Sequence, residues 1–207
     1  MVAGLKRPLR VAFGLFFTRS TRGARDFCAN LAIAAIVLLP LSISSSAELS
    51  RPGEYEVKAA FLYNFVKFTE WPPEQLGKDG DPFVIGVLGK DPFGTALDKV
   101  IQGETIHRKT IVARRFARID EAAASSHVLF IGASEENHLT GVLRVLAGQS
   151  VLTISEIENF AHRGGVIHLK KENNRIVFEI NLEAAKRAKL NMDAQLLRLA
   201  KIVRNAP

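Results

Sequence analysis

Apolar residues recur along the chain, from residue 55 onward, with a period that switches between that of a helix and that of a strand. Val57, Phe61, Phe65 and Phe68 share one face of a helix with a repeat of about 3.6 residues. They predict a helix over residues 55–68, which two nearby prolines would end. This face should pack against the core of a folded domain.

Four short stretches predict strands, at residues 83–89, 110–116, 127–131 and 151–154. The first and third are continuous apolar runs, which are typical of strands buried on both faces. Helical patterns separate the strands at residues 91–101, 120–124 and 135–147, with Asp91 as the expected N-cap of the first helix. Strands that alternate with helices favour an α/β fold, with a mostly parallel sheet flanked by helices on both faces.

The C-terminal part of the chain predicts a hairpin followed by two helices. Residues 165–169 and 175–180 flank Asn173 and Asn174, and asparagine tolerates the positive φ of a tight turn. Residues 182–189 should form a helix, and Asp193 should cap a last one whose inward face includes Leu199. We therefore expect a C-terminal antiparallel hairpin at the edge of the sheet.

Residues 1–47 have the pattern of a secretory signal peptide. Residues 1–25 are basic without an acid, residues 31–39 are apolar, and Ser45 and Ala47 suit a signal peptidase site. The apolar stretch is shorter than the roughly 20 residues of a membrane-spanning helix, although an uncleaved signal anchor remains the alternative. We expect cleavage after Ala47, a periplasmic location, and a single domain over residues 48–207.

Charge and cysteine content exclude several classes of protein. The net charge is +7, but residues 47–207 carry 22 Lys and Arg against 20 Asp and Glu, so the excess lies largely in the leader. A nearly balanced domain does not indicate a nucleic-acid partner. The single cysteine, Cys28, also lies in the leader, which leaves the mature chain without a disulfide or a thiol nucleophile.

The sequence contains no motif that indicates catalysis. Ser134 follows a predicted strand but suits an N-cap better than a nucleophile, because Glu135 and Glu136 follow it. His162 and His168 lie six residues apart, and a metal site there would need a third ligand. We expect no enzymatic activity, metal or cofactor, although a hydrolase with an unrecognised site stays open.

Other residues suggest binding. Lys90 lies in the loop after the strand at 83–89, where α/β sheets bind ligands, and Tyr63 and Trp71 fall away from the apolar helix face. These three predict a small-ligand pocket, against the alternative of a tight turn and ordinary packing. Phe160 precedes a Gly-Gly pair and is either a lid on the core or an exposed interface anchor. Phe178 is either a buried strand residue or part of the same interface.

Several segments resemble the YfiR/HmsC family of periplasmic proteins. They are VKAAFLYNFVKFTEWP, IGVLGKDPFG, HVLFIGASE, VLTISEIENFAHRGG and RIVFEINLEAAKRAKLNMDAQLLRLAK, in matching order between Tyr55 and Lys201. The resemblance implies a non-enzymatic regulator that binds the periplasmic sensor domain of an inner-membrane, YfiN-type diguanylate cyclase. Repression would lower cyclic di-GMP signalling, biofilm and exopolysaccharide.

The resemblance also implies partners and a surface. It implies a homodimer and an outer-membrane lipoprotein that sequesters the regulator, and it points to residues 154–178 as the partner-binding segment. Within that segment we expect Phe160, Glu172 and Phe178 to contact the partner. The alternative function is a periplasmic module that binds a small ligand, such as a nucleotide or an aromatic amino acid, through Lys90 and the aromatic side chains.

Overall fold

The computed structural model describes residues 53–204. The predicted signal peptide and its cleavage site lie outside these residues. Within them, no helix is long and apolar enough to cross a membrane.

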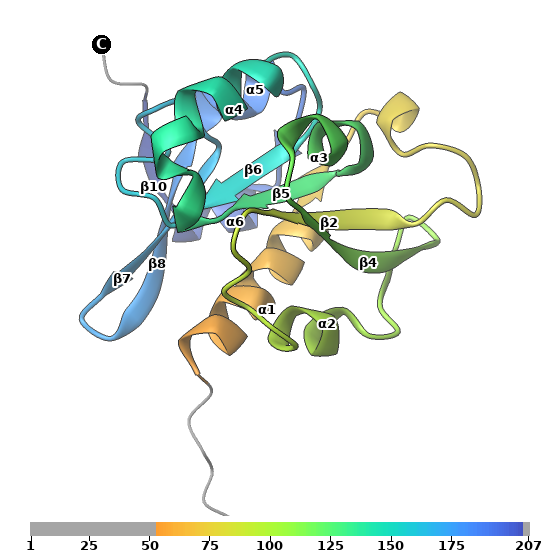
Figure 1. The fold of residues 1–207 in the computed structure, drawn as a ribbon, viewed down its shortest axis with the longest axis horizontal. Helices are drawn as coiled ribbons and strands as arrows, with labels where there is room; N and C mark the ends of the chain where they lie inside the picture. Colours follow the sequence, from red (N-terminus) through yellow and green to blue (C-terminus); the bar gives the residue numbers. More distant parts are fainter. Residues whose placement is uncertain (1–52, 205–207) are drawn as a thin grey trace, which may run out of the picture. The chain divides into compact units, whose positions relative to one another are not determined.

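A mixed sheet of eight strands forms the centre of the described domain (Figure 1). The strands, in their order across the sheet, are β10 (Lys201–Val203), β8 (Arg175–Asn181), β7 (Ile167–Glu172), β6 (Leu152–Ser155), β5 (Val128–Ile131), β2 (Phe83–Leu88), β4 (Lys109–Phe116) and β3 (Thr105–Ile106). The strands from β7 to β4 run parallel, whereas β7 and β8 form an antiparallel hairpin. A separate antiparallel pair joins β1 (Thr69–Glu70) to β9 (Asn191–Met192).

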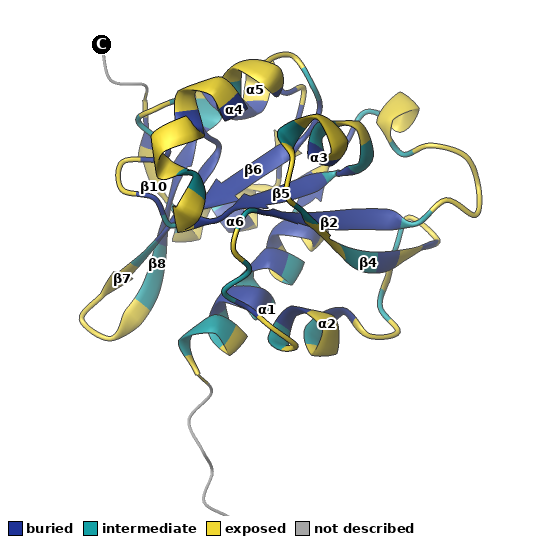
Figure 2. Cartoon of the chain, in the orientation of Figure 1, coloured by how far each residue is buried: buried dark blue, intermediate teal, exposed yellow. Residues whose placement is uncertain are grey.

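Helices cover both faces of the sheet and bury its central strands (Figure 2). They are α1 (Glu54–Lys67), α2 (Ala96–Ile101), α3 (Ile119–Ser125), α4 (Leu139–Val145), α5 (Leu182–Arg187) and α6 (Ala194–Leu199), with 3-10 turns η1 (Pro73–Gln75) and η2 (Ala133–His138). One core cluster receives α1, α2, α5 and α6, and the other receives α3 and α4. The predicted fold class is therefore confirmed.

The C-terminal end departs from the sequence prediction. The hairpin β7–β8 is not the outermost part of the sheet, because β10 returns and pairs in parallel with β8. Leu199, expected to face inward, is 77% exposed, since α6 ends there and the chain turns into β10. The structure thus adds an edge strand that the predicted helical pattern had concealed.

Two N-terminal details also differ. The buried face of α1 is centred on Leu62, Phe65 and Val66, whereas Phe61 is only partly buried. The second helix begins at Ala96 rather than near Asp91. Asp91 does not cap it, because its Oδ1 accepts the Phe93 N–H at 2.7 Å and closes a turn before the helix.

Candidate functional site

Phe160 lies in the connection between β6 and β7 and is completely buried. Its ring packs with Leu139 and Ile157 in the core cluster beneath α3 and α4. Gly165 makes this possible, since a Cβ at that position would lie 2.1 Å from ring atom Cε1. The chain folds back here, and the Gly165 N–H donates to the Phe160 carbonyl at 3.0 Å. The interpretation of Phe160 as an exposed anchor is therefore wrong, and the residue is a lid on the core.

Phe178 belongs to the opposite face of the sheet. It is 5% exposed, and its ring centroid lies 5.1 Å from that of Phe65 in α1. Of the three predicted partner-binding residues, only Glu172 is exposed, at the end of β7, where it pairs with Lys170 at 3.2 Å. The structure separates these residues instead of gathering them into one patch, because the two phenylalanines support the sheet from its two sides.

The predicted ligand pocket is not formed by its three residues. Trp71 is 5% exposed and packs on Phe83, at the start of β2, and its indole N–H donates to the His127 carbonyl at 3.2 Å. Lys90 is exposed beyond the other end of the same strand. Tyr63 donates its hydroxyl to a glutamate carboxylate, Glu104. Trp71 thus contributes to core packing and Tyr63 to a local hydrogen bond, so the prediction of a shared pocket is wrong.

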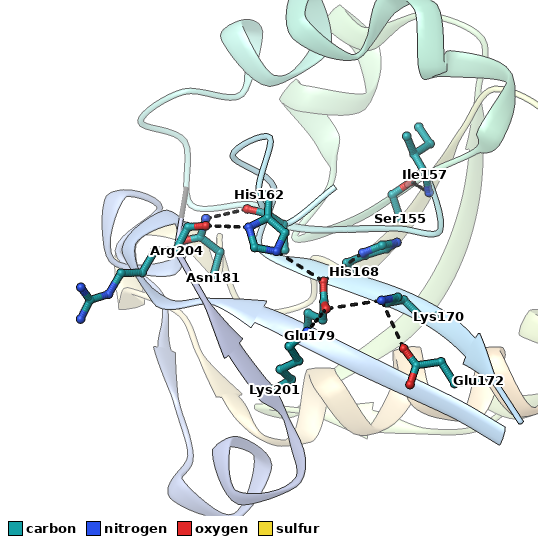
Figure 3. A network of polar contacts seen from close by, with 11 residues as sticks. Ser155, Ile157, His162, His168, Lys170, Glu172, Glu179, Asn181, Lys201 and Arg204 are labelled. Carbon is teal, nitrogen blue, oxygen red and sulfur yellow. Dashed lines mark hydrogen bonds and ion pairs between the residues drawn. The ribbon is translucent and has the colours of Figure 1, made fainter. Parts of the chain in front are cut away.

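A buried carboxylate is the centre of a polar network on the hairpin (Figure 3). The Glu179 side chain, on β8, is 5% exposed. Its Oε1 lies 3.1 Å from Lys201 Nζ and 3.5 Å from Lys170 Nζ, while its Oε2 lies 3.3 Å from His168 Nδ1. His162 Nε2 lies 4.0 Å from the same Oε2. Four basic groups thus converge on one carboxylate, and they come from β7, β10 and the connection that precedes β7.

The charge state of this network follows from its surroundings. Burial alone would raise the pKa of Glu179, but hydrogen bonds from Lys201 and His168, with the charge of Lys170, hold it below its ordinary value. Burial lowers the pKa of His168, and the neighbouring Glu179 opposes that shift only in part. Glu179 is consequently ionised at neutral pH.

The network fastens together segments that are distant in sequence. His162 Nδ1 lies 3.0 Å from the carbonyl of Arg204, the residue after β10, which ties the connection after β6 to the end of the described chain. Asn181, in β8, donates its side-chain amide to the Ala161 carbonyl at 2.7 Å. Polar contacts therefore join the β6–β7 connection, the hairpin β7–β8 and the edge strand β10 into one unit, which lies beside the exposed Glu172.

A second buried charge lies at the carboxyl end of β6. Lys58, on α1, is 3% exposed, and its ammonium group lies 2.5 Å from Glu156 and 2.6 Å from Glu54. Burial would lower the pKa of Lys58, but the hydrogen bonds to both carboxylates outweigh it and raise the pKa. A cavity of about 320 Å³ lies between this cluster and His168 and Lys170. The amine anchors α1 to the loop that follows β6.

The hydroxyls of Ser155 and Ser134 are used in local hydrogen bonds. Ser155 pairs with His168 across β6 and β7, but its hydroxyl donates to the Ile131 carbonyl at 2.7 Å and accepts the Ile157 N–H at 3.0 Å. Ser134 accepts the Lys90 N–H at 2.9 Å and so joins two loops. Among the described residues, no group of three or more His, Cys, Asp or Glu could hold a metal ion.

Acidification is expected to lower the free energy of unfolding between pH 7 and pH 5. Burial lowers the pKa of both His127 and His168. As the pH falls, the two imidazoles therefore bind protons in the unfolded chain before they do so in the folded protein. The stabilisation that comes from keeping them neutral is complete above the ordinary histidine pKa of about 6.5, and it is lost as the pH falls through their lower folded values. The slope is at most about 1.4 kcal/mol per pH unit for each histidine. Urea unfolding of wild type and His168→Gln at pH 7.5 and 5.5 measures the effect.

The matched control is His138→Gln, since the His138 side chain is 76% exposed. His138→Gln should keep the full loss of stability on acidification, and His168→Gln should reduce it. An identical loss in both variants would contradict the assignment to His168.

Comparison with known proteins gives a family match over most of the described domain. A family model described as YfiR/HmsC-like matches residues 55–201, from the first turn of α1 to the first residue of β10. The crystal structure of a conserved domain protein from Vibrio cholerae O1 biovar El Tor str. N16961 is similar at a TM-score of 0.46 and 11% identity. That match covers 72% of this chain, which spans 60% of the other chain's length. The family match confirms the resemblance expected from the sequence over the same residues.

Proposed function

Because the chain belongs to the YfiR/HmsC-like family of periplasmic regulators, we propose that it represses an inner-membrane diguanylate cyclase by binding that enzyme's periplasmic sensor domain. The observation that carries the proposal is the family match over residues 55–201. The regulator acts by binding alone, which accords with the engaged hydroxyls of Ser134 and Ser155. Cyclic di-GMP output and biofilm formation fall when it is bound.

The partner binds to the surface of one unit, which consists of the hairpin, the connection before it and β10. The tip of the hairpin is exposed (Figure 2), and Glu172 at the end of β7 is one of its exposed residues. Side chains alternate along a strand, so Lys170, Arg175 and Lys201 lie on the same face of the sheet as Glu179. Phe178 lies on the other face and supports the surface from beneath. The partner-binding feature in this proposal is therefore a charged surface, and not the aromatic anchor expected from the sequence.

The distribution of charge along the domain indicates the chemistry of the partner surface. Residues 160–204 contain ten Lys and Arg against four Asp and Glu, whereas residues 53–159 contain eleven against fifteen. A surface in the basic part attracts an acidic partner and speeds the encounter. The same asymmetry disfavours a homodimer that pairs two copies of this surface. The homodimer implied by the family would therefore use another face.

Repression requires a difference in affinity between two states of the cyclase. A regulator can silence the enzyme only if it binds the inactive conformation better than the active one. Sequestration by an outer-membrane lipoprotein would release the cyclase by removing free regulator. Both steps depend on the same exposed surface.

The proposal is tested by measuring binding of the purified protein to the periplasmic domains of the diguanylate cyclases encoded in the same genome. We expect saturable binding to one of them, weakened about tenfold or more by Arg175→Glu, because reversing an exposed basic charge opposite Glu172 costs attraction to an acidic partner and adds repulsion. Lys99→Glu is the matched control, since Lys99 is an exposed base on α2, in the other part of the domain. Folded protein that binds none of the domains would overturn the proposal.

A further inference from the structure

A cavity of about 330 Å³ is lined by residues of both α4 and α5, which are drawn near each other at the top of Figure 1. Its volume is at the lower end of the range of small-molecule sites in proteins. Its lining comes from three parts of the chain, residues 140–153, 164–166 and 184–188. The apolar residues among them are Leu143, Leu146, Val151, Val166, Ala184 and Ala188. An apolar lining of this kind favours a ligand with a hydrocarbon body.

Two arginines line the same cavity from different elements. Arg144 belongs to α4 and Arg187 to the end of α5. Neither forms an ion pair with any residue between 53 and 204, whereas Arg115 is held by Asp91 and Asp98. Two guanidinium groups without acidic partners beside an apolar surface are an arrangement that a carboxylate can complete.

A buried hydroxyl adds a third polar group. Thr153 is 5% exposed and also lines the cavity. Its Oγ1 accepts the Val166 N–H at 3.0 Å, which leaves the hydroxyl hydrogen available to an oxygen atom in the cavity. Because a buried donor without an acceptor is unfavourable, the cavity favours an occupant that carries oxygen.

The turns around the cavity keep it accessible. Gly148 has a φ of +79° and Gly164 a φ of +103°. Residues other than glycine rarely adopt this backbone conformation. A Cβ at Gly148 would meet no atom within 4 Å, and one at Gly164 would meet only Leu143 Cδ1 at 4.0 Å. These turns therefore leave space beside the cavity that larger residues would occupy.

We propose that this cavity binds a small organic carboxylate with an apolar body, through Arg144, Arg187 and the apolar surface between α4 and α5. The carboxylate pairs with the guanidinium groups, and the hydrocarbon part covers the lining. The site differs from the pocket predicted from Lys90, Tyr63 and Trp71. It shares the connection before β7 with the surface of the proposed function, through Gly164 and Val166, but it requires no protein partner.

The test is an NMR titration of the full chain, purified as the cell produces it, with 3-phenylpropionate and with octanoate. We expect saturable shifts of backbone amides in α4, at the start of β6 and in α5. Arg187→Gln and Arg144→Gln should each raise the dissociation constant about tenfold, as expected for a lost charge-assisted hydrogen bond. Arg198→Gln is the matched control, because Arg198 is an exposed arginine on α6 that does not line the cavity.

A second variant tests the cavity without removing charge. Ala147 is exposed at its rim, so Ala147→Phe should obstruct the opening and weaken binding of both carboxylates. Equal binding of 3-phenylpropanol, equal shifts with inorganic phosphate, or no saturation at millimolar carboxylate would each overturn the proposal. Because the titration uses the isolated protein, these results are independent of whether a cyclase binds.

Discussion

Replacing Phe160 with alanine is expected to lower the free energy of unfolding by about 3–5 kcal/mol, the range for large-to-small changes of buried aromatic residues. The ring is fully buried, with Leu139 and Ile157 in its cluster. Its removal leaves a cavity that the sheet on one side and the helices on the other can close only in part. Urea unfolding at pH 7.5, monitored by circular dichroism, measures the change.

This result distinguishes a core residue from an interface residue. Phe160→Ala should weaken partner binding only as far as it unfolds the protein, and Phe160→Leu should recover most of the stability. Glu172→Ala, on the exposed end of the hairpin, should change stability by no more than about 0.5 kcal/mol. Unchanged stability in Phe160→Ala would restore the exposed anchor that the sequence suggested.

Local patterns predicted most of the central sheet, because the information lies within each segment. β2 and β5 are buried along their whole length, so their apolar runs were readable without knowledge of their neighbours. The hairpin turn was also readable, since Asn173 and Asn174 adopt φ values of 48° and 60°. Such features need only the preference of a residue for its own backbone conformation.

The elements that were missed depend on contacts between distant segments. β10 has three residues, too few to show a strand period, and it forms because β8 offers a free edge. Lys58 lies within the buried face of α1, where a lysine is unexpected, and only Glu156 and Glu54 make its burial acceptable. The i, i+4 spacing on a helix can pair Glu54 with Lys58, but no periodicity assigns Glu156, which is 98 residues away in the sequence.

The candidate site was hidden for the same reason. Glu179 stands between Phe178 and Ile180 in a strand, so alternation predicts an outward and solvated carboxylate. The connection after β6 and the edge strand cover it instead, through His162 and Lys201. A sequence signal did exist, because basic residues concentrate after residue 160, but it does not reveal which acid they surround.

Replacing Glu179 with glutamine is expected to release this unit from the sheet and to cost about 2 kcal/mol of stability at neutral pH. Removing one member of a buried ion pair costs about 3–5 kcal/mol, and the loss here is smaller because the freed lysines can turn to solvent. Lys201 is 71% exposed in its side chain, which supports that reduction. Glutamine keeps the shape of the side chain and removes its charge, so no cavity complicates the measurement.

Hydrogen exchange shows where the loss occurs. Amides of β10 and of residues 156–166 should exchange faster in Glu179→Gln, whereas those of β2 and β5 should change only with global stability. Glu172→Gln is the matched control, because it removes an exposed carboxylate from the same hairpin. Equal exchange in both variants would show that Glu179 does not fasten the edge strand.

The pH dependence gives an independent check on the charge. The pKa of Glu179 is lowered in the folded protein, so its stabilising effect is present above the unfolded glutamate pKa of about 4.3 and is lost as the pH falls through the lower folded value. The stability difference between wild type and Glu179→Gln should therefore shrink below about pH 4. A difference that stayed constant would assign the effect to shape or hydrogen bonding instead. If the difference does shrink, the surface beside Glu172 is held in place by an ionised carboxylate, and its presentation to a partner depends on a charge beneath it.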